Sequence, residues 1–390
     1  MKTIAVITSS RAEFGLLMPV IKKLKKLESK DFLIEVVVTG THLSHEFGYT
    51  VEDIIKNDIN IDVEIKIPLD SESPIDISHN QAITLEKFTE LFMQKKYDGI
   101  VILGDRYEML SIAIAAGNTQ TPIFHLCGGD TTEGAIDEWI RHSITKMSYI
   151  HFPTNYESYN RIIQLGESPD RVFNFGSTSI DNIIESANMD VDFALNSLGL
   201  NNCSYAICTY HPVTMEKSNV QKVVYEFLDA IEQFPEIQFI VTKSNADQGG
   251  NEINAILEKN EKKIENLHVF SSLGVKRYLS LMKNCEFVLG NSSSGIIEAP
   301  AFKVPTVNIG NRQRGRLQSK SIINCGEEAS SIVLAIKTAL SVEFRMVCAK
   351  VESPYGKGDS AEKISRKIYD IILNKEIDLR KKFYNSGEKK

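Results

Sequence analysis

The stretch Phe287-Val288-Leu289-Gly290-Asn291-Ser292-Ser293-Ser294-Gly295 joins an apolar run to a cluster of small hydroxyl residues. The apolar run predicts a buried strand of a parallel sheet, and the serines with Gly295 predict the start of a helix. The first N–H groups of a helix have no partner within it, so they can bind a phosphate or diphosphate. An ordinary serine N-cap would have the same sequence. Glu298, one turn further on, favours a nucleotide, because its carboxylate can accept hydrogen bonds from both hydroxyls of a ribose.

Strands and helices alternate on both sides of this stretch, which is typical of doubly wound parallel sheets. The expected strands are 4–7, 34–38, 99–103, 122–126, 150–152, 172–175, 205–209, 239–242, 267–270, 287–290 and 304–309. The expected helices are 15–27, 80–95, 108–117, 137–146, 220–233, 251–259, 274–283 and 361–374. The alternation restarts after Gly176-Ser177-Thr178. We therefore predict an α/β protein with two Rossmann-like domains facing a cleft.

The predicted boundaries are 1–176 for an N-terminal domain, which carries most of the candidate carboxylates, and 177–360 for a C-terminal nucleotide-binding domain. Residues 361–390 form a last helix and a charged tail that can pack back on the N-terminal domain. We expect the tail itself, 375–390, to fray, because chain ends with many charges bury little surface.

Composition narrows the classes of function. The chain has 390 residues and a net charge of −7, which argues against nucleic acid or an anionic membrane as partner. No segment approaches the roughly 18 apolar residues of a membrane span, and the N-terminal residues lack the pattern of a signal peptide, so we expect a cytoplasmic protein. The six cysteines are scattered, and no set of residues has metal-ligand spacing. We predict neither a metal site nor a cofactor.

Polar and ionisable residues gather where the predicted strands end, and parallel strands end at one edge of a sheet, where ligands bind. Each residue taken alone has a structural explanation. Asp105 after a strand and a glycine can cap a helix, His211 before a proline can belong to a turn, and Arg312 can lie in a solvated loop. The residues weighed together are Arg11, Asp105, Arg106, Asp130, Asp137, His142, His211, Ser292, Ser293, Glu298 and Arg312.

An ordered set of motifs resembles the hydrolysing UDP-N-acetylglucosamine 2-epimerases of bacterial sialic-acid and legionaminic-acid biosynthesis. The motifs are Thr8-Ser9-Ser10-Arg11-Ala12-Glu13, Gly104-Asp105-Arg106-Tyr107-Glu108, Gly128-Gly129-Asp130 with 136–142, His211-Pro212-Val213-Thr214, Asn291–Gly295 with 308–313, and Ser353-Pro354-Tyr355-Gly356. The resemblance covers nearly the whole chain. It implies a GT-B-like fold, a nucleotide-sugar substrate held mainly by the second domain, a homodimer or homotetramer, and no redox cofactor.

The family eliminates UDP from UDP-N-acetylglucosamine to give a 2-acetamidoglycal, and then adds water to release N-acetylmannosamine. Such chemistry needs a base for the C2 proton and cations for the departing diphosphate. The resemblance implies catalytic roles for Asp105, Asp130, Asp137 and His211. It implies nucleotide or diphosphate binding by Arg11, Ser292, Ser293, Ser294, Gly295, Glu298 and Arg312, and sugar binding by Arg106, Glu138 and His142. Which carboxylate is the base stays open.

Cys127 departs from the pattern, because some members have a catalytic glutamate directly before the Gly-Gly pair. A thiol at its usual pKa cannot replace that base, so we expect Asp130, or Asp105 with Asp137, to serve instead.

Several alternatives stay open. The same reaction could act on a UDP- or GDP-linked 2,4-diacetamido-2,4,6-trideoxyhexose. The scaffold would also suit a non-hydrolysing epimerase, a glycosyltransferase or a non-catalytic nucleotide-sugar sensor.

Overall fold

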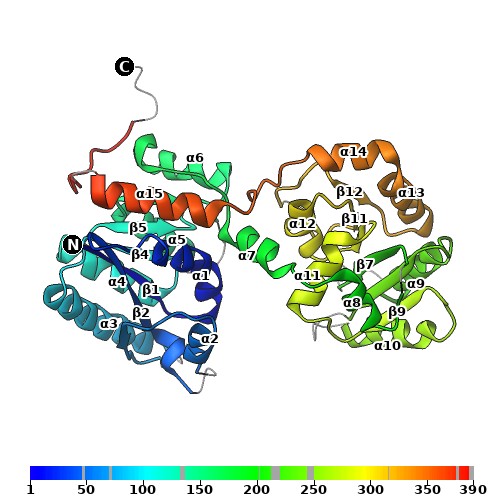
Figure 1. The fold of residues 1–390 in the computed structure, drawn as a ribbon, viewed down its shortest axis with the longest axis horizontal. Coiled ribbons are helices and arrows are strands. Elements are labelled where there is room, and N and C mark those ends of the chain that lie inside the picture. Colours follow the sequence, from blue (N-terminus) through cyan, green and yellow to red (C-terminus); the bar gives the residue numbers. More distant parts are fainter. Residues whose placement is uncertain are drawn as a thin grey trace. The chain divides into compact units, whose positions relative to one another are not determined.

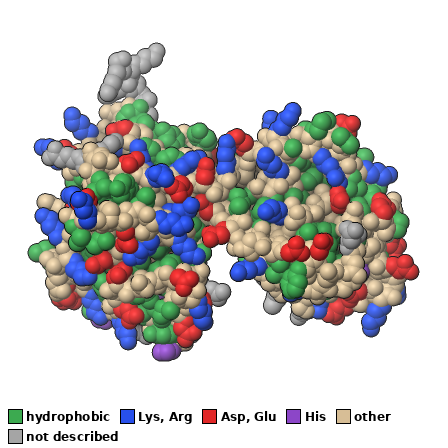
Figure 2. All heavy atoms as spheres, viewed as in Figure 1, with side chains coloured by type: hydrophobic (Ala, Val, Ile, Leu, Met, Phe, Trp, Pro, Cys, Tyr) green, Lys and Arg blue, Asp and Glu red, His purple; other side chains and the backbone are tan. Residues whose placement is uncertain are grey.

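The structure, a computed structural model, describes residues 1–45, 49–69, 73–131, 137–201, 203–211, 220–243, 250–314, 316–374 and 377–385. The chain divides into two compact units (Figure 1). Unit 1 is Met1–Asn182 with Gly358–Lys390, and unit 2 is Ile183–Lys357. Charges of both signs are interspersed over the face of each unit that Figure 2 shows. Within the described residues, no helix combines the length and apolarity that a membrane span requires.

Unit 1 contains one parallel six-stranded sheet in the order β3-β2-β1-β4-β5-β6. Its strands are β1 (Lys2–Thr8), β2 (Phe32–Thr39), β3 (Val63–Ile65), β4 (Gly99–Leu103), β5 (Ile123–Leu126) and β6 (Ile150–Phe152). Its helices are α1 (Arg11–Lys25), η1 (Gly40–Leu43), α2 (Val51–Ile55), α3 (Pro74–Gln94), α4 (Tyr107–Asn118), α5 (Asp137–Met147), α6 (Tyr156–Gln164), η2 (Pro169–Arg171) and α15 (Ser360–Asn374). The unit boundary falls within α7 (Thr178–Ser186).

Helices cover both faces of this sheet, which explains why its strands are apolar on both sides. On one face α1 and α15 lie side by side (Figure 1), and Leu17 and Ile368 join the core around Ile4. On the other face α3, α4 and α5 supply a second core, in which Met109 is fully buried. The predicted last helix therefore belongs to unit 1, although it lies far along the chain from the other elements.

Unit 2 repeats the topology, with the order β12-β11-β10-β7-β8-β9. Its strands are β7 (Tyr205–Thr209), β8 (Gln238–Thr242), β9 (Leu267–Phe270), β10 (Val288–Gly290), β11 (Thr306–Ile309) and β12 (Ile322–Cys325). Its helices are α8 (Val191–Asn196), α9 (Val220–Ile231), α10 (Gly250–Glu261), α11 (Val275–Asn284), α12 (Ser294–Ile297), η3 (Ala299–Phe302), α13 (Ala329–Leu340) and α14 (Val342–Lys350). In both units the fourth strand pairs with the first, so the chain reverses its winding direction there. The predicted fold class, with two Rossmann-like α/β halves, is confirmed.

The strand predicted at residues 172–175 is wrong, because only Val172 bridges the edge strand β6. The rings of Phe173 and Phe175 instead stack on each other and pack against Phe152. The helix predicted to start at the Ser-rich stretch is present as a single turn, α12, which η3 follows directly. Pro300 lies at the start of η3 and has no N–H to continue an α-helix.

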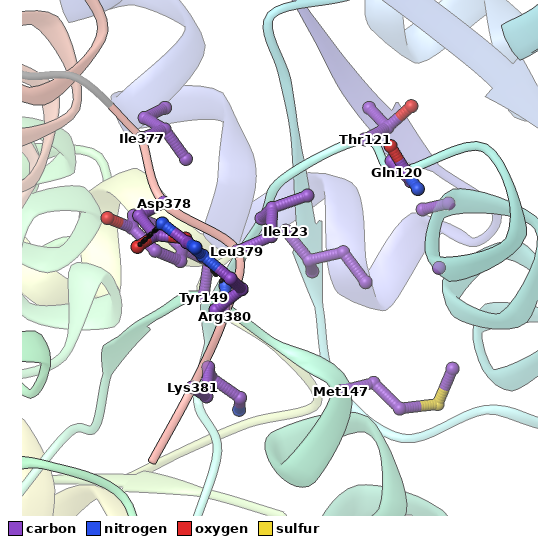
Figure 3. Close-up of a pocket in the computed structure, with 12 residues that line it drawn as sticks. Gln120, Thr121, Ile123, Met147, Tyr149, Ile377, Asp378, Leu379, Arg380 and Lys381 are labelled. Carbon is purple, nitrogen blue, oxygen red and sulfur yellow. Dashed lines mark hydrogen bonds and ion pairs between the residues drawn. The ribbon is translucent and has the colours of Figure 1, made fainter.

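The expectation of a frayed tail is wrong for residues 377–385. The Lys381 ammonium lies 2.8 Å from Glu167 Oε2, and the backbone N–H of Tyr384 donates to the carbonyl of Gly166. Figure 3 shows this segment running past Ile123 and Tyr149, where it forms one wall of a cavity of about 510 Å³. Ile123 begins β5, so the cavity lies at the amino ends of the strands and away from the candidate site at their carboxyl ends.

Candidate active site

The candidate residues of each unit follow strands that meet at the reversal of the winding, where open α/β sheets bind ligands. In unit 1 Asp105 lies two residues beyond β4, next to the end of β1. In unit 2 His211 follows β7, and Ser292 follows the adjacent β10. Gly104 has a φ of +84°, so the turn before Asp105 uses a backbone conformation that favours glycine.

Arg141 of α5 connects two of the predicted acids. Its Nη2 group donates to the Asp105 carboxylate, and its Nη1 group donates to the backbone carbonyl of Asp130 over 2.9 Å. Glu138, one turn earlier on α5, lies 3.5 Å from the same guanidinium. The Arg141 side chain is 7% exposed, whereas a quarter of the Asp105 side chain is exposed. A buried cation therefore fixes an acid that can still reach a ligand.

The Asp130 side chain is held from α6. Ser158 Oγ and Asn155 Nδ2 both donate to Asp130 Oδ1, the latter over 3.3 Å. Asn155 is also the N-cap of α6, so the same residue begins the helix and orients the acid. Gly129 has a φ of +81°, and a Cβ there would lie 2.4 Å from the Ser158 carbonyl oxygen. The Gly-Gly-Asp turn consequently requires glycine at position 129.

His125 of β5 packs against this turn and is hydrogen-bonded to the turn before Asp105. Its Nε2 donates to the Gly104 carbonyl over 3.0 Å, and burial lowers its pKa to about 3. A Cβ at Gly128 would lie 2.8 Å from the His125 ring. His125 is therefore a neutral structural residue that positions the chain before Asp105.

Cys127 does not supply a base. Burial, and then the nearby charges of Asp130 and Asp105, raise the pKa of its thiol to about 12. The thiol therefore stays protonated at neutral pH.

The remaining candidates of unit 1 lie on the same edge. Asp137 begins α5 and is partly exposed, and no side-chain hydrogen bond to it is seen within the described part of the chain. His142 Nε2 lies 3.1 Å from Glu138 Oε1, and the two residues are one turn apart on α5. Arg106 donates from Nε to Glu108. Arg11 begins α1, but its side chain lies outside the described residues.

In unit 2 Asn291 locks the ends of β7 and β10 together. The His211 N–H donates to Asn291 Oδ1, and Asn291 Nδ2 donates to the His211 carbonyl, both over 2.7 Å. Arg312 Nη1 and Gln313 Nε2 donate to the Asn291 carbonyl over 3.0 and 2.8 Å. Asn291 thus holds His211 through its side-chain amide and Arg312 through its backbone carbonyl.

The Ser-rich turn forms a hydroxyl cluster at the start of α12. Ser294 Oγ lies 2.9 Å from Ser292 Oγ and 2.8 Å from the Tyr278 hydroxyl. Ser293 makes no side-chain capping bond, so the N-cap explanation does not account for it. Burial raises the pKa of Glu298 to about 7, and its Oε2 is buried with no donor among the described residues. A carboxyl group in this state fits a ligand that brings hydroxyl donors.

Three further residues of the site, Arg141, Asn291 and Tyr278, were not predicted from the sequence. Arg141 lies in the quoted motif, four residues after Asp137 and three after Glu138, so helical spacing could have found it. Asn291 directly precedes the serines. Tyr278 carries no local signal, because its contact with Ser294 depends on how α11 packs.

Comparison with known proteins identifies the family of the chain. A family model described as UDP-N-acetylglucosamine 2-epimerase matches residues 25–369. The chain belongs to this family. It is 40% identical over 88% of its length to a Campylobacter jejuni protein named GDP/UDP-N,N'-diacetylbacillosamine 2-epimerase (hydrolyzing), covering 89% of that protein.

Other relatives extend the comparison. The chain is 35% identical over its full length to the Escherichia coli polysialic acid biosynthesis protein P7, covering 98% of it. A Neisseria meningitidis UDP-GlcNAc 2-epimerase structure bound to UDP-GlcNAc matches with a TM-score of 0.78 at 18% identity, covering 95% of this chain and all of the other. That similarity shows the fold, and the family predicted from the sequence motifs is confirmed.

Proposed function

We propose that this member of the UDP-N-acetylglucosamine 2-epimerase family is a hydrolysing enzyme that converts UDP-N-acetylglucosamine and water to N-acetylmannosamine and UDP. In the first step a carboxylate removes the C2 proton, the C1–O bond to the diphosphate breaks, and a C1=C2 double bond forms. In the second step a proton adds to the opposite face of C2 and a hydroxyl group adds to C1. The name of the Campylobacter jejuni relative supports a hydrolysing reaction.

The observation that carries this proposal is the bridge that Arg141 makes between Asp105 and the Asp130 turn. Elimination and hydration need acid–base groups at fixed positions around one carbon. Asp105 and Asp130 lie in the turns that follow the neighbouring strands β4 and β5, and both are restrained, whereas Cys127 keeps its proton. We assign proton transfer to Asp105, Asp130 and Asp137, and leave open which of them is the base.

Unit 2 holds the leaving group in this proposal. Ser292 and Ser293 donate to the diphosphate, Arg312 neutralises it, and Glu298 accepts from the ribose. His211 lies at the end of β7, next to the serines, and contacts the phosphate or sugar. The buried Glu298 carboxyl with an unpartnered oxygen supports the ribose assignment.

A second substrate has specific support. The Campylobacter jejuni relative, at 40% identity, and a Legionella pneumophila relative, at 30%, carry names for the 2-epimerisation of diacetylbacillosamine nucleotides. The same elimination and hydration would act on that sugar, because it differs from N-acetylglucosamine away from C1 and C2.

The test is product analysis with UDP-N-acetylglucosamine and UDP-N,N'-diacetylbacillosamine side by side. We expect UDP and a free sugar with inverted C2 from one of them. Asp105→Asn and Asp137→Asn should abolish UDP release while UDP binding, measured by calorimetry, remains. Near-normal turnover in both variants, or UDP-N-acetylmannosamine as the product, would contradict the proposal.

A further inference from the structure

Two buried glutamates meet at the end of β1 and β4, behind the candidate acids. Glu13 lies in the first turn of α1 and Glu108 in the first turn of α4. Glu13 is 5% exposed and Glu108 is fully buried. Ser9, the residue after β1, lies between them: its Oγ is 2.8 Å from Glu13 Oε2 and 2.8 Å from Glu108 Oε1. Three oxygens therefore lie in a row within hydrogen-bond distance.

The two short contacts of Ser9 Oγ need two protons if both are hydrogen bonds, and the Ser9 hydroxyl supplies only one. A hydroxyl group donates a single hydrogen bond, so it cannot donate to both carboxylates. The Arg106 Nε group donates to Glu108 Oε1, so this oxygen already accepts a charged hydrogen bond, and it is the acceptor for the Ser9 hydroxyl. The short contact between Ser9 and Glu13 is then a hydrogen bond only if Glu13 carries the proton and donates it to Ser9.

We propose that Glu13 and Glu108 are positioning residues that hold one proton between them through the Ser9 hydroxyl, and thereby keep a single negative charge beside Arg106. Arg106 follows Asp105, and 39% of its side chain is exposed. Its guanidinium carbon lies 6.0 Å from the centre of the Tyr107 ring, and its Nη groups make no hydrogen bond within the described part of the chain. The Nη groups can therefore bind a ligand while Glu108 holds Nε. That Arg106 serves substrate binding rests on the proposed function, whereas the shared proton does not.

The charges around the pair agree with this arrangement. Burial, and then the charge of Glu108, raise the pKa of Glu13 to about 7, although the Ser9 N–H and hydroxyl act in the opposite direction. His42 lies 3.0 Å from the neighbouring Thr8, and burial lowers its pKa to about 4, so it brings no charge at neutral pH. The other ionisable groups near the pair are Asp105 and Arg106 before α4, Tyr107 at the start of α4, and Arg11 on α1, whose side chain lies outside the described residues.

A purely structural role explains the arrangement less well. Ser10-Arg11-Ala12-Glu13 has the pattern of a capping box, in which Glu13 would accept from the Ser10 N–H. Glu13 accepts from the Ser9 N–H instead, over 2.8 Å. Moreover, Glu13 Oε1 and Glu108 Oε2 are buried and have no donor among the described residues, which is costly for two full negative charges.

The direct test is infrared difference spectroscopy of the full-length protein between pH 5 and pH 9. We expect the C=O band of a protonated carboxylic acid that titrates near pH 7 and is lost in Glu13→Gln. Glu298→Gln identifies the separate band of Glu298, and the exposed Glu86→Gln is the control that leaves the spectrum unchanged.

If the titrating band is the same in Glu13→Gln as in the wild type, Glu13 does not hold the proton and the proposal fails. Ser9→Ala keeps both carboxyl groups and should shift the titration midpoint; an unchanged midpoint also contradicts the bridge.

Kinetics with UDP-N-acetylglucosamine or its diacetamido analogue then test the positioning role. Glu108→Gln should raise KM about tenfold or more while kcat changes by less than about threefold, since it removes the partner of a substrate-binding arginine. From pH 6 to pH 8.5 the KM of the wild type should rise relative to that of Glu13→Gln by at least about threefold. Only the wild type has a carboxyl group at position 13 that can lose its proton in this range. A constant ratio would contradict the positioning role. If no nucleotide-sugar is turned over by any protein, the proposed function fails, and the infrared result still decides the shared proton.

Discussion

At the scale of single residues, the candidate site consists of charges whose partners fix them. Asp105 could be selected from the sequence because it follows a strand and a glycine. Its partner Arg141 was harder to select, because the contact depends on how α5 packs against α4 and β5. The protonation state of Cys127 could not be predicted either, because the sequence does not show whether the thiol is buried.

Cys127→Ser should keep most of the activity, within about fivefold of the wild type. The thiol has a pKa of about 12 and is neutral, so a neutral hydroxyl replaces it without loss of charge. The measurement is kcat/KM for UDP release, with Asp105→Asn as the inactive reference. A thousandfold loss would show that the thiol takes part in the chemistry.

Glu298 predicts that nucleotide binding depends on pH. Its pKa is raised to about 7 by burial, so it is mostly protonated below pH 7 and ionised above. Ribose hydroxyls donate to the ionised form, so UDP should bind more tightly as the pH rises through 7 and should release a proton on binding at pH 6.5.

Calorimetry in two buffers of different ionisation enthalpy measures this release. Glu298→Gln should abolish it and weaken UDP binding about tenfold at pH 8, which corresponds to one charged hydrogen bond of roughly 1.5 kcal/mol. The exposed Glu265→Gln is the control. Equal proton release by the variant and the wild type would rule out Glu298 as the group.

At the scale of elements, the strand ends were predicted well and the turns after them less well. Apolar runs such as 99–103 and 205–209 match β4 and β7 residue for residue, because both are buried on both faces. The start of the helix after β10 was predicted but not its length, which is one turn because η3 follows with Pro300 in its first turn. The aromatic residues at 173 and 175 predicted a strand because ring packing and sheet pairing favour similar residues.

Gly290→Ala should destabilise unit 2 severely. Gly290 has a φ of +133°, and a Cβ there would lie 2.0 Å from the Thr209 carbonyl oxygen, where β10 pairs with β7. We expect a loss of more than about 3 kcal/mol in the free energy of unfolding, because the clash is with backbone. Gly199→Ala is the matched control: its φ is +77° in open space, and the cost should be about 1 kcal/mol. Equal denaturation midpoints for the two variants would contradict this.

At the scale of the whole molecule, two halves of the same topology each bring their polar residues to the point where the winding reverses. The alternation of strands and helices was sufficient to predict this, because it needs only local periodicity. The place of the C-terminal segment was not predictable to the same degree. An amphipathic helix at 361–374 shows that it has a buried face, but not that it joins α1 across more than 300 residues of sequence.

The tail is held by a buried ionic cluster at Glu167. Burial would raise the pKa of Glu167, but hydrogen bonds from His151, Lys146 and Lys381 outweigh it and lower the pKa to about 2. A carboxyl group with a lowered pKa stabilises the fold above its unfolded pKa, and this stability is lost as the pH falls towards 2.

Lys381→Met should therefore lower the free energy of unfolding at pH 7 by about 2–3 kcal/mol and reduce the loss of stability on acidification. The exposed Lys382→Met should change neither. Denaturant titrations at pH 7 and pH 4 measure both effects. If Lys381→Met matched Lys382→Met at pH 7, the cluster would not hold the tail.

The central claim is elimination followed by hydration in a hydrolysing epimerase. It is tested most directly by turnover in deuterated water, with NMR of the product. We predict free N-acetylmannosamine, or the corresponding diacetamido sugar, with deuterium at C2, since the proton added in the second step comes from solvent. A product that keeps the original C2 proton, or one that still carries the nucleotide, would contradict the account.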